Sequence, residues 1–283
     1  MTNLRTAYPT FERVLARSGG NNEHLPSSDE IVWAQTIARG QRQILSLIVL
    51  LKCSQTMGYV PSLMAVPEEI VRPIAIHLAM IGVISVADLK LTPLSRRALY
   101  SPDGYQAAIR HRLGLRAFGA EAQAELKSHL TRATQTQHST IDLINAAVEW
   151  LWREKIELLG FDRLRRICGQ VNTASHHSIE RQVMSRVDKS LRDQLDTLLK
   201  PVPGQIFADW IRIRERPGAP TLHALREYLD FADWVWDLGN LDPIVTDVPI
   251  PKLRHYSAEA MELAASDLLN FGDTESGPLG QWH

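Results

Sequence analysis

The chain has 283 residues, 45% of them hydrophobic and 22% charged, which is the balance of a globular protein with a core and excludes wholesale disorder. Its net charge of −1 excludes a uniformly basic surface. The charge is unevenly distributed, since residues 1–200 carry 25 Lys+Arg against 19 Asp+Glu, and residues 201–283 carry 6 against 13.

Helical periodicity dominates, and no alternating strand or hairpin signal stands out, so we expect an all-α fold. Residues 1–27 are polar and glycine-bearing, without the apolar stretch of a signal peptide, and are expected to be a flexible lead-in. Ser27 or Ser28 then caps a helix that pauses at Gly40. A helix over 41–57 follows, and its apolar run of eight residues is far below the roughly 20 that a membrane span needs.

The next expected helices cover 67–81, 102–113, 120–133, 141–155, 161–186 and 188–199, and most begin at a capping residue or a proline. Thr92-Pro93 marks a further helix start, before the one at Ser101-Pro102. Prolines and glycines near 201–204 and 217–220 mark breaks. Beyond them, apolar residues from Leu222 to Trp236 step by 3, 4, 3 and 4, which predicts an amphipathic helix. A last helix is expected over 257–269, after prolines that interrupt the chain.

These breaks predict two compact helix-turn-helix-like domains and a helical extension. The ranges are 1–27 for the lead-in, 28–116 and 117–200 for the two domains, 201–270 for the extension and 271–283 for a frayed tail. Cys53 and Cys168 lie in apolar helical patterns and are too few for a disulfide framework, so we expect them in the core of a cytoplasmic protein.

The strongest electrostatic feature is the segment 90–116, in which six Lys and Arg residues face one Asp, a net of +5. Arginines at the end of a helix can follow a line of phosphates, and such binding weakens steeply with salt. The alternative is that these arginines only decorate a solvated helix. Arg39 and Arg42, at a helix start, are expected to join this surface.

A second basic cluster begins at Arg163 and continues to Arg181. Arg, Asn and His side chains on a helix can contact base edges in the major groove, although an ordinary polar helix surface looks the same. The expected DNA-contacting residues of both clusters are Arg39, Arg42, Arg96, Arg97, Arg110, His111, Arg112, Arg116, Arg163, Arg166, Asn172, His176 and Arg181.

Catalytic and metal-binding patterns are weak. His176 and His177 are adjacent, so they point about 100° apart on a helix and have no metal-binding partner at helical spacing. Asp230, Asp233 and Asp237 share a helix face, which more simply indicates a solvated acidic surface. Because no nucleophile motif or phosphate-binding glycine loop is present, we expect a chain without enzymatic activity, metal or cofactor.

Several motifs, in order over residues 28–270, resemble the N-terminal region of the cointegrate-forming replicative transposases, the TnpA proteins of the Tn-three family. They are Gly58-Tyr59-x-Pro61 after an apolar helix, Val66-Pro67-x-x-Ile70, Ala108-Ile109-Arg110 with Leu113-Gly114, Asp142 to Asn145 with Glu157-Leu158 and Phe161-x-x-Leu164, Pro220-x-Leu222-x-x-Leu225 with Trp234 and Leu238-Gly239, and Pro249-x-x-Lys252 with Arg254-His255-Tyr256 and Ala258-Glu259-Ala260. Residues 100–105 and 168–172 are less basic than in that family.

This resemblance implies an all-helical region that binds the terminal inverted repeats of a transposon. The family's acidic catalytic triad lies far downstream and has no counterpart here, so DNA binding is carried over and strand transfer is not. The expected partner is double-stranded DNA, with a downstream catalytic domain or a second copy as further partners and no membrane. The alternative is a non-catalytic protein-interaction or regulatory module, or a decayed transposase remnant, with the acidic segment 220–239 and the helix 257–269 as docking surfaces.

Overall fold

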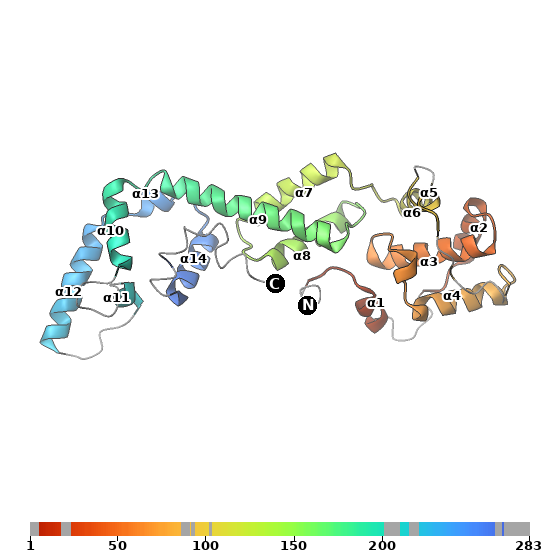
Figure 1. The fold of residues 1–283 in the computed structure, drawn as a ribbon, viewed down its shortest axis with the longest axis horizontal. Coiled ribbons are helices and arrows are strands. Elements are labelled where there is room, and N and C mark those ends of the chain that lie inside the picture. The colour runs from red at the N-terminus through yellow and green to blue at the C-terminus, as the bar shows by residue number, and fades with distance from the viewer. Residues whose placement is uncertain are drawn as a thin grey trace. The chain divides into compact units, whose positions relative to one another are not determined.

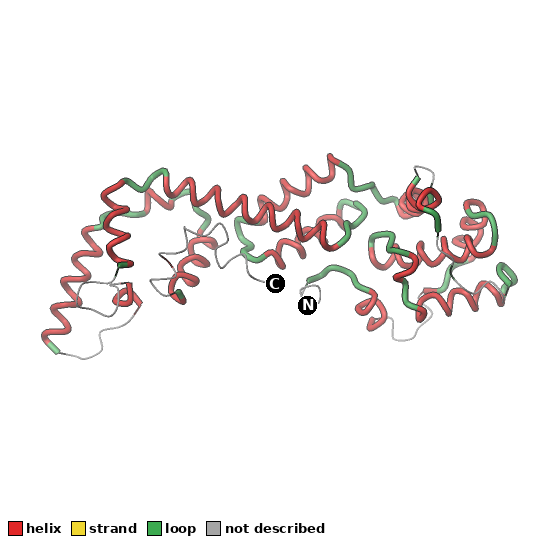
Figure 2. The backbone as a smooth tube through the Cα atoms, viewed as in Figure 1, coloured by secondary structure: helices red, strands yellow, loops and turns green. Residues whose placement is uncertain are grey.

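The computed structural model describes residues 6–17, 24–85, 91, 94–101, 104–200, 210–214, 221–263 and 268. Among them, helices joined by turns make up the fold, and no β-strand is present, which confirms the all-α class (Figures 1 and 2). In the described part of the chain, no helix is both long enough and apolar enough to cross a lipid bilayer. Lys90, residues 102–103 and the expected tail 271–283 lie outside the described residues.

The helices occur in the following order along the chain. They are α1 (Phe11–Arg17), α2 (Ser28–Ile37), α3 (Gln41–Met57), the short 3-10 helix η3 (Leu63–Ala65), α4 (Glu68–Met80), α5 (Arg96–Tyr100), α6 (Tyr105–Leu113), α7 (Ala120–Ala133), α8 (Thr140–Arg153), α9 (Phe161–Met184), α10 (Lys189–Leu199), α11 (Trp210–Arg214), α12 (Leu222–Asp237), α13 (Asp242–Val245) and α14 (Ile250–Glu262).

The contacts group the chain into two compact units. Unit 1 consists of residues 1–132 and 140–169, and unit 2 of residues 133–139 and 170–283. The long helix α9 therefore begins in unit 1 and ends in unit 2. The contacts therefore do not divide the chain at residue 116, where the sequence predicts a domain boundary. Whether 28–116 and 117–200 fold as separate domains stays a prediction.

The core of unit 1 is built around α3. Its residues from Leu47 to Leu51 are completely buried, because α2, α4 and α6 pack around it. A helix that is apolar on most sides must be covered on most sides, so this central position follows from the sequence. Cys53 is also buried, and so is Cys168 in α9, which confirms the expected core placement of both.

The N-terminal segment is packed and not loose. Tyr8 is 3% exposed, and its hydroxyl donates a 2.7 Å hydrogen bond to the carbonyl oxygen of Leu159. Burial raises the pKa of Tyr8 well above its ordinary value. Helix α1 adds Val14 to the core. Residues 6–17 thus belong to unit 1, which corrects the expectation that all of 1–27 is a flexible lead-in.

The segment after α8 joins several parts of unit 1. Lys155 has a positive φ of 52°, the left-handed conformation that ends a helix, and the chain then runs extended. There the amide of Leu158 donates a hydrogen bond to the carbonyl oxygen of Gly58 at 2.9 Å. The amide of Glu157 likewise donates to the carbonyl oxygen of Arg116 at 2.9 Å. Gly58 is needed here, because a Cβ on its left-handed backbone would lie 3.1 Å from Leu158.

Unit 2 contains the second half of α9 together with α10 to α14. Arg186 after α9 pairs with Asp247 before α14, and Gln182 donates to the same carboxylate at 3.0 Å. Helix α14 starts at Ile250 and not at 257, because Pro249 is its N-cap and Pro251 stands in its first turn. Proline is tolerated there since it lacks only an amide that the helix does not use. The prolines therefore start the last helix and do not interrupt the chain.

Candidate nucleic-acid interface

Helices α5 and α6 form a tight turn that carries part of the first predicted surface. Ser95 caps α5 through a 3.1 Å bond from the amide of Ala98. Gly104 before α6 is buried, and a Cβ there would lie 2.9 Å from the carbonyl oxygens of Ala98 and Leu99. Only glycine lets the two helices approach this closely. The sequence predicts separate helix starts at Thr92-Pro93 and at Ser101-Pro102, so two helices were expected here, although the bounds of α5 were not given.

Three predicted DNA-contacting residues on these helices are exposed: Arg96 and Arg97 in the first turn of α5, and His111 near the end of α6. Among the described residues, no ion pair involves Arg96 or Arg97. Both side chains are therefore free to contact an anionic partner.

Arg110 of α6 has a different role. Its guanidinium lies 2.9 Å from Oε2 of Glu157, and the Gln106 side chain donates to Oε1 of the same carboxylate at 2.7 Å. Glu157 is only 7% exposed. A buried carboxylate needs such partners, since its desolvation is costly. Arg110 thus fastens α6 to the segment after α8, which corrects its assignment as a phosphate contact.

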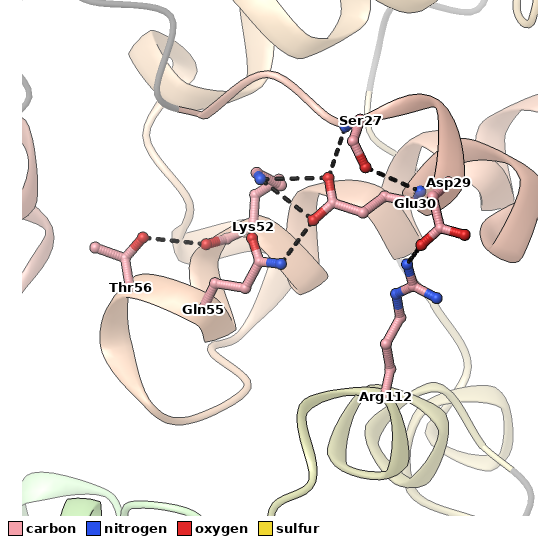
Figure 3. Close-up of polar contacts among 7 residues, drawn as sticks. All are labelled: Ser27, Asp29, Glu30, Lys52, Gln55, Thr56 and Arg112. Atoms are coloured by element: carbon pink, nitrogen blue, oxygen red, sulfur yellow. Dashed lines mark hydrogen bonds and ion pairs between the residues drawn. The ribbon is translucent and has the colours of Figure 1, made fainter.

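Arg112 is similarly engaged, with α2. It donates to the carboxylate of Asp29 (Figure 3). Its guanidinium also lies 5.1 Å from the centroid of the Trp33 ring. Next to it, Glu30 accepts hydrogen bonds from the Ser27 amide at 2.7 Å and from the Gln55 side chain at 2.6 Å. These contacts hold α2, α3 and α6 together. Arg112 thus contributes to holding α6 on α2, while Asp29 itself is largely exposed, and a phosphate contact by Arg112 stays a prediction.

Glu30 shows how strongly this cluster favours a charged carboxylate. Burial alone would raise its pKa, but hydrogen bonds from the Ser27 amide and Gln55, with the ammonium of Lys52 at 3.3 Å, lower the pKa below its ordinary value. Ser27, one of the two expected N-cap residues, also forms a reciprocal capping box with Glu30 at the start of α2.

Arg116 forms a more exposed pair. It lies 2.8 Å from Glu125 of α7, and the hydrogen bond and charge of that carboxylate raise the pKa of Arg116. Both side chains are more than one-third exposed, so the pair is weak and can exchange with a phosphate. The net charge of the segment 90–116 is nevertheless partly compensated by carboxylates from elsewhere in the fold.

The start of α9 carries a group of three exposed arginines. Arg163, Arg165 and Arg166 are all exposed in its first two turns. Arg163 lies 5.3 Å over the ring of Phe118 and donates to Gln123 at 3.4 Å, which orients its guanidinium without neutralising it. Among the described residues, no carboxylate pairs with Arg165 or Arg166.

Asn172 and His176 point into unit 2, not to solvent. The Oδ1 atom of Asn172 is buried, and Nδ1 of His176 shares a 2.7 Å hydrogen bond with the hydroxyl of Tyr256 in α14. Desolvation, reinforced by the charges of Lys252 and His255, lowers the pKa of His176 to about 4. Both residues are therefore unsuited to reading bases, which corrects their assignment.

Helical spacing in the sequence already indicates that Asn172 and His176 lie on a packed face. Asn172 and His176 are spaced by four residues and continue into Ile179 and Val183, which is one face of the helix. That face is the one packed in unit 2. For Arg110 and Arg112 no local signal exists, because their partners are 47 and 83 residues away in sequence.

The remaining predicted residues lie elsewhere. Arg39 is exposed between α2 and α3, and Arg42 is exposed in the first turn of α3. Arg181 is exposed in unit 2, and its Nε donates to the His177 carbonyl at 3.3 Å within α9. Within the described ranges, no three His, Cys, Asp or Glu side chains are grouped so that they could hold a metal ion.

Residues 2–171 match a protein family described as a domain of unknown function, DUF4158. Because the match covers more than half of the chain, the chain belongs to this family. The matched range takes in the described residues of unit 1 and therefore the turn α5–α6 and the start of α9. Comparison with curated proteins gives no match.

Proposed function

We propose that this chain is the DNA-binding part of a transposase and recognises the terminal inverted repeats of its transposon in the cytoplasm. The ordered motifs that resemble the Tn-three family support this assignment. In this proposal the chain itself performs no strand transfer, and its partner is double-stranded DNA. The DUF4158 family description names no activity, so the argument depends on the residues.

The observation that carries the proposal is the division of the arginines of unit 1 into two classes. Arg110 and Arg112 are held by carboxylates and fix α6 in the fold. The arginines at the starts of α5 and α9 are exposed and, among the described residues, have no carboxylate partner. Guanidiniums that the fold does not neutralise are the groups that bind phosphate bidentately.

The two classes have complementary roles in this proposal. The buried pair Arg110–Glu157 makes α6 rigid, so that His111 and the neighbouring α5 are presented in a fixed orientation. Arg96 and Arg97 then contact the phosphates, which sets register and orientation on the duplex. The first turns of α9 add Arg163 and Arg166, which can contact phosphates or guanine edges in the major groove.

A competition gel-shift with the full chain tests this function. The labelled duplex carries the terminal inverted repeat of the nearest transposon, and the competitors are the same duplex and a shuffled duplex of equal composition and length. We expect the inverted repeat to compete about 10³-fold or more better than the shuffled duplex, as specific sites do. Equal competition, or no retardation of either duplex by a folded chain, would contradict the proposal.

One observation favours a second candidate, a protein-interaction module. Helix α12 in unit 2 exposes several large apolar side chains, with Trp236 85% exposed. Surfaces of this kind mark contacts with other proteins. This candidate predicts binding to a protein partner without preference for inverted-repeat DNA.

A further inference from the structure

Helix α12 is anchored by one face and presents an apolar stripe on another. Phe231 is 8% exposed, so this side of the helix is covered by other parts of unit 2. Within the helix, Phe231 stacks with Trp234 at 5.8 Å between ring centroids. The stripe Leu222, Leu225, Leu229, Ala232 and Trp236 is exposed along its whole length. Leu222 and Trp236, at its ends, are 78% and 85% exposed.

The spacing of the stripe is that of a coiled-coil seam. Its residues step by 3, 4, 3 and 4, which are the core positions of two successive heptads. Every side chain in the stripe is large except that of Ala232. A second helix of the same sequence running in the opposite direction places Leu229 beside this alanine and Leu225 beside Trp236. The space beside the small Ala232 is then filled by the large Leu229 of the other copy in both central layers of the contact.

The charges beside the stripe fit the same antiparallel arrangement. Arg226 and Asp233 are both exposed and occupy equivalent positions of successive heptads on one side of the seam. In an antiparallel pair, Arg226 of each copy lies beside Asp233 of the other, so the contact contains two opposite-charge pairs. In a parallel pair, each of these positions would instead face the position on the other side of the partner's seam, so Arg226 and Asp233 would not meet and neither opposite-charge pair would form.

We infer that α12 is a self-association surface, on which a second copy of this chain docks with its own α12 antiparallel. This inference is independent of the proposed DNA-binding function, because it concerns another helix in unit 2. Helix α12 has 16 residues and is about 24 Å long. One such helix pair is smaller than a standard protein interface, so the dimer is weak and forms at micromolar concentrations.

Sedimentation velocity of the full chain over a concentration series, without DNA, tests the inference. We expect a reversible monomer–dimer equilibrium. Arg226→Asp alone and Asp233→Arg alone each place like charges together and weaken dimerisation about tenfold or more. The double variant restores the opposite-charge pairs in exchanged positions and recovers dimerisation. The matched control Arg192→Asp, an exposed charge change on α10, leaves it unchanged.

Cross-linking determines the orientation. Chains carrying Leu229→Cys are mixed with chains carrying Ala232→Cys, and both native cysteines are buried and do not interfere. We expect a disulfide between the two kinds of chain in preference to one between identical chains. A monomer at all concentrations, a double variant that is not rescued, or preferential Leu229→Cys homodimers would overturn the inference. Circular dichroism establishes that every variant is folded.

Discussion

Glu157 illustrates how a single residue changes the meaning of a basic sequence. The segment 90–116 is strongly basic as a sequence. Within it, however, the charge of Arg110 is neutralised by the buried carboxylate of Glu157, which also accepts a hydrogen bond from Gln106. A guanidinium engaged in this way is a poor phosphate ligand, because leaving the pair would expose a buried, uncompensated carboxylate. The exposed arginines are therefore better candidates for DNA contacts than the arginines within α6.

Glu157→Ala tests the structural role of this pair. It leaves Arg110 and Gln106 without their acceptor, so we expect the free energy of unfolding to fall by about 2–4 kcal/mol. The measurement is the urea midpoint of the full chain. The matched control is Glu154→Ala, which removes an exposed carboxylate from the pair with Arg153 and is expected to cost less than about 0.5 kcal/mol. Equal effects of the two substitutions would contradict the structural role of Glu157.

His176 predicts a dependence of stability on pH. Its pKa in the folded chain is about 4, against an ordinary value of 6.5, because burial and the facing groups Lys252, His255, His138 and His177 disfavour its charged form. Between these values the unfolded chain binds a proton that the folded chain does not. The free energy of unfolding therefore falls as the pH falls from about 6.5 to about 4.

Urea unfolding across this pH range measures the effect. His176→Gln keeps a hydrogen-bonding side chain but cannot titrate, so we expect a shallower loss of stability on acidification. His223→Gln, which changes an exposed histidine in α12, is the control and leaves the slope unchanged. An unaltered pH dependence in His176→Gln would show that His176 is not the group responsible.

At the scale of the elements, local signals located most helices and failed where tertiary contacts decide. Capping residues and periodicity predicted α2, α3, α4 and α8 within a few residues, because the hydrogen bonds that begin and end a helix are local. The break between α5 and α6 was expected from the capping residue and proline at Ser101-Pro102. The close packing of Gly104 against the end of α5 was not, because no pattern in the sequence marks it.

The candidate site was predictable from the sequence only in part. Residue type and charge located the exposed arginines at the starts of α5 and α9. The carboxylate partners of Arg110 and Arg112 come from distant segments, so only the fold reveals them. Asn172 and His176 were predictable from helical spacing as members of a packed face, since they share it with Ile179 and Val183.

Gly104→Ala tests the α5–α6 turn. Its Cβ would meet two backbone carbonyl oxygens at 2.9 Å, and backbone atoms cannot move aside cheaply. We expect a loss of about 1–3 kcal/mol in thermal unfolding experiments. The control Gly169→Ala places a methyl group in open space within α9, where alanine is expected to stabilise by about 0.5–1 kcal/mol. A neutral Gly104→Ala would mean that the turn is not closely packed.

At the scale of the whole molecule, each unit offers a different kind of surface. Unit 1, which takes up most of the DUF4158 match, exposes arginines that the fold does not neutralise. Unit 2 exposes the apolar stripe of α12 between charges of both signs. This separation is consistent with a chain that binds DNA through one unit and associates with a second copy through the other. We therefore expect that either property can be removed by substitution without altering the other.

The central claim is that the exposed arginines of unit 1 bind DNA phosphates, and the salt dependence of inverted-repeat binding tests it most directly. For the full chain, we expect log K to fall linearly with log salt concentration. Arg96→Ala/Arg97→Ala and Arg163→Ala/Arg166→Ala should each weaken binding and reduce the slope by about 2, whereas Arg192→Ala on α10 should not. The claim would be contradicted if the unsubstituted chain and all three variants gave the same slope of log K against log salt concentration. It would also be contradicted if salt did not weaken binding to the inverted repeat.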